Sequence, residues 1–224
     1  MNRPSPAKRR ILDTAKELIY SRSFADVGIQ EICERAAVNK GSFYYFFPSK
    51  QAQTLAVIDA FAEQLQREVI IEAFAAEVAP LERLHRLCEG LFRFHAGTKA
   101  QTGHMQGSLY GNLAIELSTQ DEPIRRKVDD IFTTLIQTFE ATLAEAMARG
   151  EIPPVDLRAS AEAMLAYVEG ITLLAKSRNS PDLIHRLGGS ITLLLISSTS
   201  GCCPTDGEVP PAEEPPRPPE NNQT

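Results

Sequence analysis

Apolar side chains recur at spacings of three and four along almost the whole chain, which is the pattern of amphipathic α-helices. The first 47 residues predict three short helices, the first with Ile11 and Leu18 on its buried face and the third over residues 40–46. Asn39 ends the turn between the second and third helices, and its side chain is suited to cap a helix N-terminus. Residues 1–50 are therefore predicted to form a three-helix head.

Longer helices follow the head, and Pro, Gly and capping residues mark where they begin and end. The polar, Gly-rich residues 97–107 are expected to form a mobile loop, and Asn179 is expected to cap the last helix ahead of Pro181. The apolar run 191–196 lies within a helical stripe, so no strand is predicted. The predicted fold class is all-α, with the head and a larger antiparallel helical body and about nine helices in all. The expected helices of the body cover residues 50–75, 80–95, 108–117, 121–149, 153–177 and 179–198.

Charge and composition divide the chain into three segments. The 224 residues have a net charge of −6, but the head has nine basic and five acidic side chains, so it is +4 (9 − 5) and the rest is −10. Residues 201–224 hold seven of the 15 prolines, and we expect a disordered acidic tail there, after a body over residues 51–200. A basic head on an acidic body indicates a contact module for nucleic acid.

Several other classes of protein are disfavoured by the sequence. The chain has no uninterrupted apolar run of 18 residues and no apolar leader, so we expect a cytoplasmic protein with no membrane partner. The spacing of His85, His95 and His104 is not that of metal ligands, and no metal or cofactor is predicted. No hydrolase, metalloprotease or phosphate-loop motif is present. Two alternatives to nucleic-acid binding remain: an enzyme on a helical bundle, and a helical adaptor with no role at DNA.

Five consecutive aromatic residues, 43–47, occupy the third helix and its end. Successive residues of a helix point in different directions, so these five cannot all face the core and some must be exposed. Exposed aromatic side chains beside Lys40 and Lys50 favour contact with nucleic acid. Gly41 costs about 1 kcal/mol of helix propensity, and its bare backbone suits a close approach to DNA. The pattern indicates a helix-turn-helix whose third helix enters the major groove.

The run from Ala36 to Lys50, AAVNKGSFYYFFPSK, follows the pattern A-x-V-x-K-G-x-[FL]-Y-x-[YF]-F-x-[SN]-K. It resembles the DNA-binding signature of the TetR family of bacterial transcriptional regulators. The basic cluster Lys8-Arg9-Arg10 is expected to reach a phosphate or the minor groove. The resemblance implies contacts to bases and phosphates of double-stranded DNA from Gln30, Asn39, Lys40, Gly41, Ser42, Tyr44, Tyr45 and Lys50.

The same resemblance implies two tasks for the body, namely homodimer formation through the last two helices and the binding of a small-molecule effector. The apolar stripes that suit a dimer interface could equally form the core of the single chain. The predicted interface residues are Leu165, Val168, Thr172, Leu187, Ile191 and Leu194. The predicted effector contacts are His95, Met105, Tyr110, Asn112, Phe132, Phe139, Tyr167 and Glu169. The expected function is a ligand-responsive repressor that binds a palindromic operator as a dimer.

A second resemblance lies at residues 107–118, GSLYGNLAIELS. This run is similar to G-C-L-x-G-N-L-A-x-E-L-S, which marks a subgroup of the family that senses electrophiles through its cysteine. Ser108 stands at the position of that cysteine, and a hydroxyl cannot replace a reactive thiolate. Cys88, expected on the neighbouring helix, is interpreted as a core cysteine of low reactivity, so thiol-based sensing is not predicted.

Overall fold

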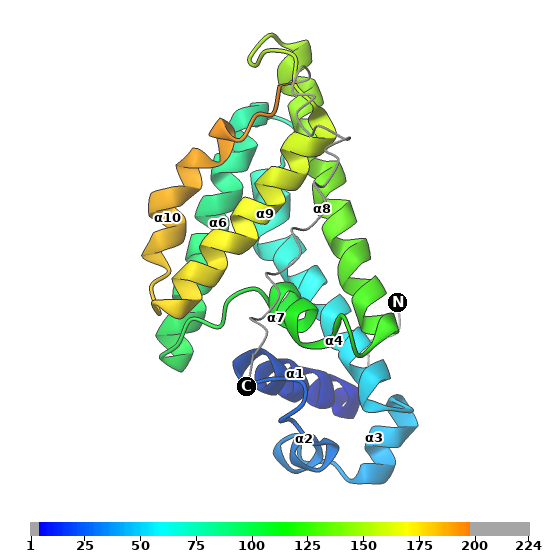
Figure 1. Cartoon of the computed structure of the whole chain (residues 1–224). Helices are drawn as coiled ribbons and strands as arrows, with labels where there is room; N and C mark the ends of the chain where they lie inside the picture. Colours follow the sequence, from blue (N-terminus) through cyan, green and yellow to red (C-terminus); the bar gives the residue numbers. More distant parts are fainter. Residues whose placement is uncertain (1–4, 198–224) are drawn as a thin grey trace, which may run out of the picture.

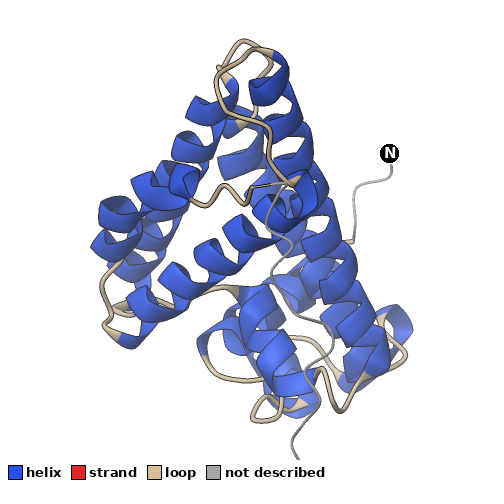
Figure 2. Ribbon diagram, turned by 45° about the horizontal axis from the view of Figure 1, so that its top comes forward, coloured by secondary structure: helices blue, strands red, loops and turns tan. Residues whose placement is uncertain are grey.

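The computed structural model describes residues 5–197, and within this range the chain is helical, with short turns between helices (Figures 1 and 2). The one pairing of the strand type among these residues is an isolated antiparallel bridge between Val155 and Ser197. The predicted all-α fold class is therefore confirmed. The expected tail at 201–224 lies outside the described residues.

Three short helices form the head: α1 (Pro6–Ser21), α2 (Ile29–Arg35) and α3 (Lys40–Phe46). The predicted span of the third helix is confirmed, and so is its cap, because Asn39 Oδ1 accepts a hydrogen bond from the Ser42 amide at 2.7 Å. Figure 1 shows α2 and α3 at the end of the molecule farthest from the helices of the body. The head therefore presents its second and third helices away from the rest of the chain.

A long helical segment connects the head to the body. It consists of α4 (Lys50–Leu65), a π-helical turn over Gln66–Ile70 and the short α5 (Ile71–Ala73). The expected single helix is thus present with one distortion, at which Val69 packs against Gly90 so closely that a Cβ on the glycine would lie 2.8 Å from Val69 Cγ1. Figure 1 shows α4 running from the head into the body, so residues of one helix pack in both parts.

Within residues 5–197 the body has five further α-helices, and side chains cap the N-termini of three of them. Ser108, Asp121 and Asp156 each accept a hydrogen bond from the backbone amide three residues ahead. These helices are α6 (Pro80–Thr102), α7 (Leu109–Leu117), α8 (Glu122–Ala148), α9 (Leu157–Ser177) and α10 (Asp182–Gly188). α7 lies between α1 of the head and the longer helices of the body (Figure 1).

Two expectations for the body are wrong. The region 97–107 is not one loop, because α6 continues to Thr102 and ends at Gly103, whose φ is +79°. Lys99 holds this last part of α6 by donating to the Asn179 carbonyl at 2.7 Å, a contact over 80 residues that local sequence does not reveal. Asn179 itself does not cap the last helix, since it adopts a φ of +48° after α9 and accepts from the Met105 amide at 2.8 Å.

The last helix is also shorter than expected. α10 ends at Gly188, a 3₁₀ helix covers Gly189–Leu193, and the chain then leaves the helical conformation. The Asp156 amide donates to the Ile196 carbonyl at 2.8 Å, so the end of the described chain is tied to the start of α9. This backbone contact replaces the helical hydrogen bonds that the apolar run 191–196 was expected to make.

Candidate nucleic-acid interface and internal cavity

The aromatic run of α3 divides between the core and the surface. Phe43 and Phe47 are 0% and 3% exposed and pack in the core of the head, whereas Tyr44 and Tyr45 are 52% and 82% exposed. Lys40 and Gly41 are exposed at the start of the same helix. The prediction that part of the aromatic run is exposed is confirmed, and the outer face of α3 combines a cation with two phenol groups.

The first turn of α3 is tightly organised. A Cβ added to Gly41 would lie 3.2 Å from Asn39 Oδ1, the atom that caps the helix, so a larger residue would press on the cap. The turn before it contains Ala37 with a φ of +50°, a left-handed conformation in which a Cβ is strained. Arg10 Nε of α1 donates to the Ala36 carbonyl at 2.9 Å and holds this turn in place.

Several polar residues of the predicted contact set are already engaged within the head. Lys50 Nζ donates to the Phe24 carbonyl and lies 3.9 Å from the centroid of the Phe24 ring, so it supports the loop between α1 and α2. Gln30 Nε2 donates to Glu34 Oε1 at 3.0 Å along the exposed side of α2. Of the predicted residues, Lys40, Tyr44 and Tyr45 are those whose side chains are exposed without such a partner among the described residues.

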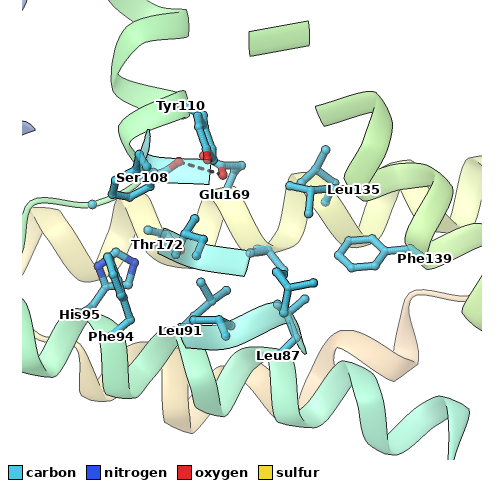
Figure 3. Close-up of a pocket in the computed structure, with 17 residues that line it drawn as sticks. Leu87, Leu91, Phe94, His95, Ser108, Tyr110, Leu135, Phe139, Glu169 and Thr172 are labelled. Atoms are coloured by element: carbon cyan, nitrogen blue, oxygen red, sulfur yellow. Dashed lines mark hydrogen bonds between the residues drawn. The ribbon is translucent and has the colours of Figure 1, made fainter. Parts of the chain in front are cut away.

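An internal cavity of about 60 Å³ lies in the body among α4, α6, α7, α8 and α9 (Figure 3). Its wall is mostly apolar and aromatic, which is usual for sites that bind small organic molecules. The lining residues are Phe61, Leu65, Val69, Ile70, Leu87, Leu91, Phe94, His95, Gly107, Ser108, Tyr110, Leu135, Phe139, Leu165, Val168, Glu169 and Thr172.

The predicted effector contacts fall into three groups. The structure brings His95, Tyr110, Phe139 and Glu169 to the internal cavity. Asn112 and Phe132 line a neighbouring outer depression, which shares Gly107, Ser108 and Glu169 with the cavity. The remaining two side chains lie elsewhere: Met105 packs in the cluster at α10, and Tyr167 donates to the Leu187 carbonyl at 2.7 Å. Neither Ser108 nor Thr172 was among the predicted effector contacts, although Ser108 stands at the position of the sensor cysteine in the motif at residues 107–118.

Glu169 is the acidic group of the cavity wall. Ser108 Oγ donates to Glu169 Oε1 at 3.0 Å, and Oε2 lies so close to Gly111 that a Cβ there would be 2.5 Å away. Burial raises the pKa of the Glu169 carboxyl from 4.5 to about 7, and the hydrogen bond from Ser108 opposes part of that rise. Near neutral pH this carboxyl is therefore poised between its neutral and charged forms.

His95 supplies a second buried polar group. It is 3% exposed, and its Nδ1 has no hydrogen-bond partner among the described residues. Burial lowers the pKa of the His95 imidazole to about 4, so the ring is neutral at pH 7. Figure 3 shows His95 on α6, at some distance from the Ser108–Glu169 pair.

Burial corrects the predicted dimer interface. Leu165, Val168, Thr172 and Ile191 are at most 7% exposed in the single chain, so they face its own core and cavity and not a partner. Helical periodicity identifies an apolar stripe but does not indicate whether the same chain or a partner chain covers it. The exposed apolar side chains of α9 are instead Leu173 and Leu174, and Leu187 and Leu194 are partly buried.

The cysteine interpretation agrees with the structure. Cys88 is 3% exposed, and a Cβ on Gly188 of α10 would lie 2.5 Å from its Cβ, so the residue is packed between two helices. Burial raises the pKa of the Cys88 thiol to about 12, which leaves little thiolate at neutral pH.

Within residues 5–197, no cluster of three or more His, Cys, Asp or Glu side chains is placed to hold a metal ion. None of the described helices combines the length and apolarity that crossing a bilayer requires.

Comparisons with known proteins match both parts of the chain. Residues 11–57 match the profile of bacterial regulatory proteins of the tetR family, and residues 80–189 match that of a tetracyclin repressor-like C-terminal domain. An uncharacterized HTH-type transcriptional regulator of Lactococcus lactis is 31% identical over 75% of this chain and 83% of its own. The transcriptional regulator AcuR of Cereibacter sphaeroides is 31% identical over 81% of each chain.

Solved structures agree with these sequence matches. A regulatory protein TetR from Rhodobacter sphaeroides superposes with a TM-score of 0.74 at 29% identity, covering 86% of this chain and all of the other. The reduced form of NemR from E. coli superposes with a TM-score of 0.71 at 20% identity over 85% of this chain and 98% of the other, a likeness of fold alone. These relatives are transcriptional regulators and not enzymes, and with its helix-turn-helix head the chain belongs to the TetR family of DNA-binding transcriptional regulators.

Proposed function

We propose that this regulator is a repressor that binds a palindromic operator as a homodimer and leaves it when a small molecule occupies the body cavity. The observation that carries the proposal is the exposed face of α3, where Lys40, Tyr44 and Tyr45 point away from the core on the outer end of the head. A cation and phenols on one short helix suit contacts to base edges and phosphates in the major groove.

The exposed side of α9 supports the homodimer. Ala166, Gly170 and Leu173 lie on it at spacings of four and three, and a Cβ added to Gly170 would meet no atom of the chain within 4 Å. Small residues on an open helix face allow another helix to approach closely. A two-fold dimer places its two reading helices in successive major grooves, roughly 34–36 Å apart, which corresponds to a palindromic operator.

The DNA contacts are tested by gel shift with the DNA that flanks the protein's own coding region. Lys40→Ala and Tyr45→Ala are expected to weaken specific binding at least fivefold, since each good contact is worth about 1–3 kcal/mol. Arg86→Ala, which removes one exposed charge from α6, is the matched control and should bind like the wild type. Unchanged binding in both head variants would refute the contact assignment, and no specific shift with any genomic fragment would refute the function.

The dimer is tested by light scattering during size-exclusion chromatography. Gly170→Arg has open space around its new side chain within one chain, so a shift to monomer reports on a partner surface and not on misfolding. Ala141→Arg, at an exposed position of α8, controls for the added charge. A Gly170→Arg variant that keeps the mass of a dimer would place the interface elsewhere.

A further inference from the structure

The polar groups of the internal cavity are few and sit mainly at one end. Figure 3 shows Glu169, Ser108 and Tyr110 together, while Leu135 and Phe139 lie well away from them. Among the described residues that line the cavity, Glu169 is the single acid, and no Lys or Arg side chain takes part. The wall therefore combines a long apolar surface with one carboxyl group.

The Glu169 carboxylate is poorly compensated by the protein. Within residues 5–197, the one hydrogen bond that reaches it comes from Ser108, and no basic side chain lies within 4.0 Å of its oxygens. Lys176, two turns along the same helix, instead donates to Asn112 Oδ1 at 2.7 Å. A partly buried carboxylate with one hydrogen bond and no cationic partner is left short of compensation, which an added cation would supply.

His95 is an independent indication of a ligand in the same cavity. Its side chain is 97% buried (3% exposed), and Nδ1 has no partner among the described residues. Native proteins pair nearly all buried polar atoms, so an unpaired Nδ1 at a cavity wall is unusual. Because the ring is neutral at pH 7, it offers an acceptor nitrogen and does not repel a positive charge.

The Glu169 carboxylate lies at the boundary between two spaces. The outer depression between α7, α8 and α9 shares Gly107, Ser108 and Glu169 with the internal cavity. Gly111 makes this placement possible, since any side chain there would displace Oε2. The carboxylate therefore lies at the end of the cavity nearest this depression, and the apolar wall lies beyond it.

We infer that the cavity takes a small organic cation, with a protonated amine that donates to Glu169 and a short apolar body that packs against the leucine and aromatic wall. The inference rests on the proposed function, in which this cavity holds the effector. An anion would face Glu169 with no basic side chain in the cavity lining to offset the repulsion, whereas an ammonium group compensates the charge and lies among the rings of Phe61, Phe94 and Tyr110. The volume of about 60 Å³ is well below the roughly 150 Å³ of a protein cavity that accommodates benzene, so the ligand is a small aliphatic amine, and a four-carbon chain, which is about as large as benzene, requires side chains of the wall to move apart.

Three probes with four-carbon skeletons separate the charge of the ligand from its apolar body: n-butylamine, 1-butanol and butyrate. Their binding is measured by isothermal titration calorimetry at pH 8, where Glu169 is mostly ionised, on the full chain and three variants. Glu169→Gln removes the charge but keeps an acceptor, and Glu63→Gln removes an exposed charge from α4 as the matched control. Leu135→Phe partly fills the apolar end of the cavity.

The expected result is that the wild type and Glu63→Gln bind butylamine at least tenfold more tightly than either other probe, that Glu169→Gln loses this preference, and that Leu135→Phe weakens binding of the amine. Equal or tighter binding of 1-butanol or butyrate, an amine affinity unaffected by Glu169→Gln or by Leu135→Phe, or no binding of the amine would each overturn the inference. The gel shift of the same preparations on operator DNA reports on the proposed function separately. A protein that binds its operator but prefers butyrate would refute the cation and leave the regulator intact.

Discussion

The buried carboxyl group in the cavity makes a quantitative prediction about stability and pH. In Glu169→Gln the acid is replaced by a neutral amide of nearly the same shape, which can still accept the hydrogen bond from Ser108. The native pKa of Glu169 is about 7 against 4.5 for an ordinary glutamate. A difference of about 2.5 pKa units corresponds to an upper limit of about 3 kcal/mol in the free energy of unfolding, and water that enters the cavity lowers it.

The direction of the pH effect on stability depends on whether the folded or the unfolded chain holds the proton of Glu169. Below pH 4.5 the carboxyl is protonated in both the folded and the unfolded chain, and its ionisation then costs nothing. As the pH rises from 4.5 to 7, the unfolded chain releases the proton while the folded chain keeps it, so this carboxyl lowers the stability of the wild type over this window and its effect then levels off. The neighbouring Tyr20 and Tyr110 stay neutral throughout, because burial raises both of their pKa values. His95 acts in the opposite direction between about pH 4 and 6.5, where the unfolded chain holds its proton and the folded chain does not, but it does so equally in both proteins and cancels from the comparison.

The assay is urea unfolding followed by far-UV circular dichroism at pH 5, 6, 7 and 8, at one protein concentration. The advantage of Glu169→Gln over the wild type should grow by about 2–3 kcal/mol between pH 5 and pH 8, or roughly 4–12 °C in melting temperature. Glu63→Gln, at an exposed site, should run parallel to the wild type. If the free energy of unfolding of Glu169→Gln also runs parallel to that of the wild type from pH 5 to pH 8, the carboxyl is not desolvated and the reasoning is refuted.

Three further predictions concern single positions. Ala37→Gly relieves a φ of +50° and should raise the melting temperature by a few degrees, about 1 kcal/mol, in a thermal scan; a lower value would contradict the strain. Gln53 is fully buried in α4 with neither amide atom paired among the described residues, so Gln53→Met should stabilise the chain to urea by about 1–3 kcal/mol, and a loss would reveal an unseen partner. Cys88 should react with N-ethylmaleimide much more slowly in the folded protein than in urea, as followed by mass spectrometry of its peptide, and rapid native labelling would contradict its burial.

The features predicted correctly from sequence are local ones. The span of α3 and its cap at Asn39 depend on residues within one helical turn, where capping chemistry is decided. The partial exposure of the aromatic run 43–47 follows from helix geometry alone. These features needed no knowledge of the tertiary structure.

The features that sequence reasoning missed depend on distant contacts. The extension of α6 depends on the hydrogen bond between Lys99 and Asn179, which are 80 residues apart. The acid of the cavity, Glu169, is bound by Ser108, which lies 61 residues before it. The sequence correctly predicts an apolar stripe on α9, but the residues of this stripe that face inward pack in the core of the single chain. Periodicity fixes which residues share a face, while the arrangement of the other helices decides what that face meets.

The position of α7 explains how an event in the cavity can reach the head. At its N-terminal end, the Ser108 hydroxyl accepts from the Gly111 amide at 3.1 Å and donates to Glu169 at 3.0 Å. At its other end, Glu116 accepts from the amides of Phe24 and Ala25 at 2.9 and 2.7 Å, in the loop between α1 and α2.

One helix of nine residues therefore touches both the acid of the cavity and the backbone of the head, and Tyr20 of α1 adds a bond of 2.5 Å to the Gly107 carbonyl just before it. A ligand that binds Glu169 with the same affinity at every position of α7 does not change the equilibrium between those positions, because a ligand shifts an equilibrium only when its affinities for the two states differ. In the proposed function, a ligand that competes with Ser108 for the carboxylate would discriminate, since it would be favoured where α7 has moved away from α9. The same movement would carry Glu116, and with it the loop before α2, which would couple competition for one carboxylate oxygen to the placement of α2 and α3.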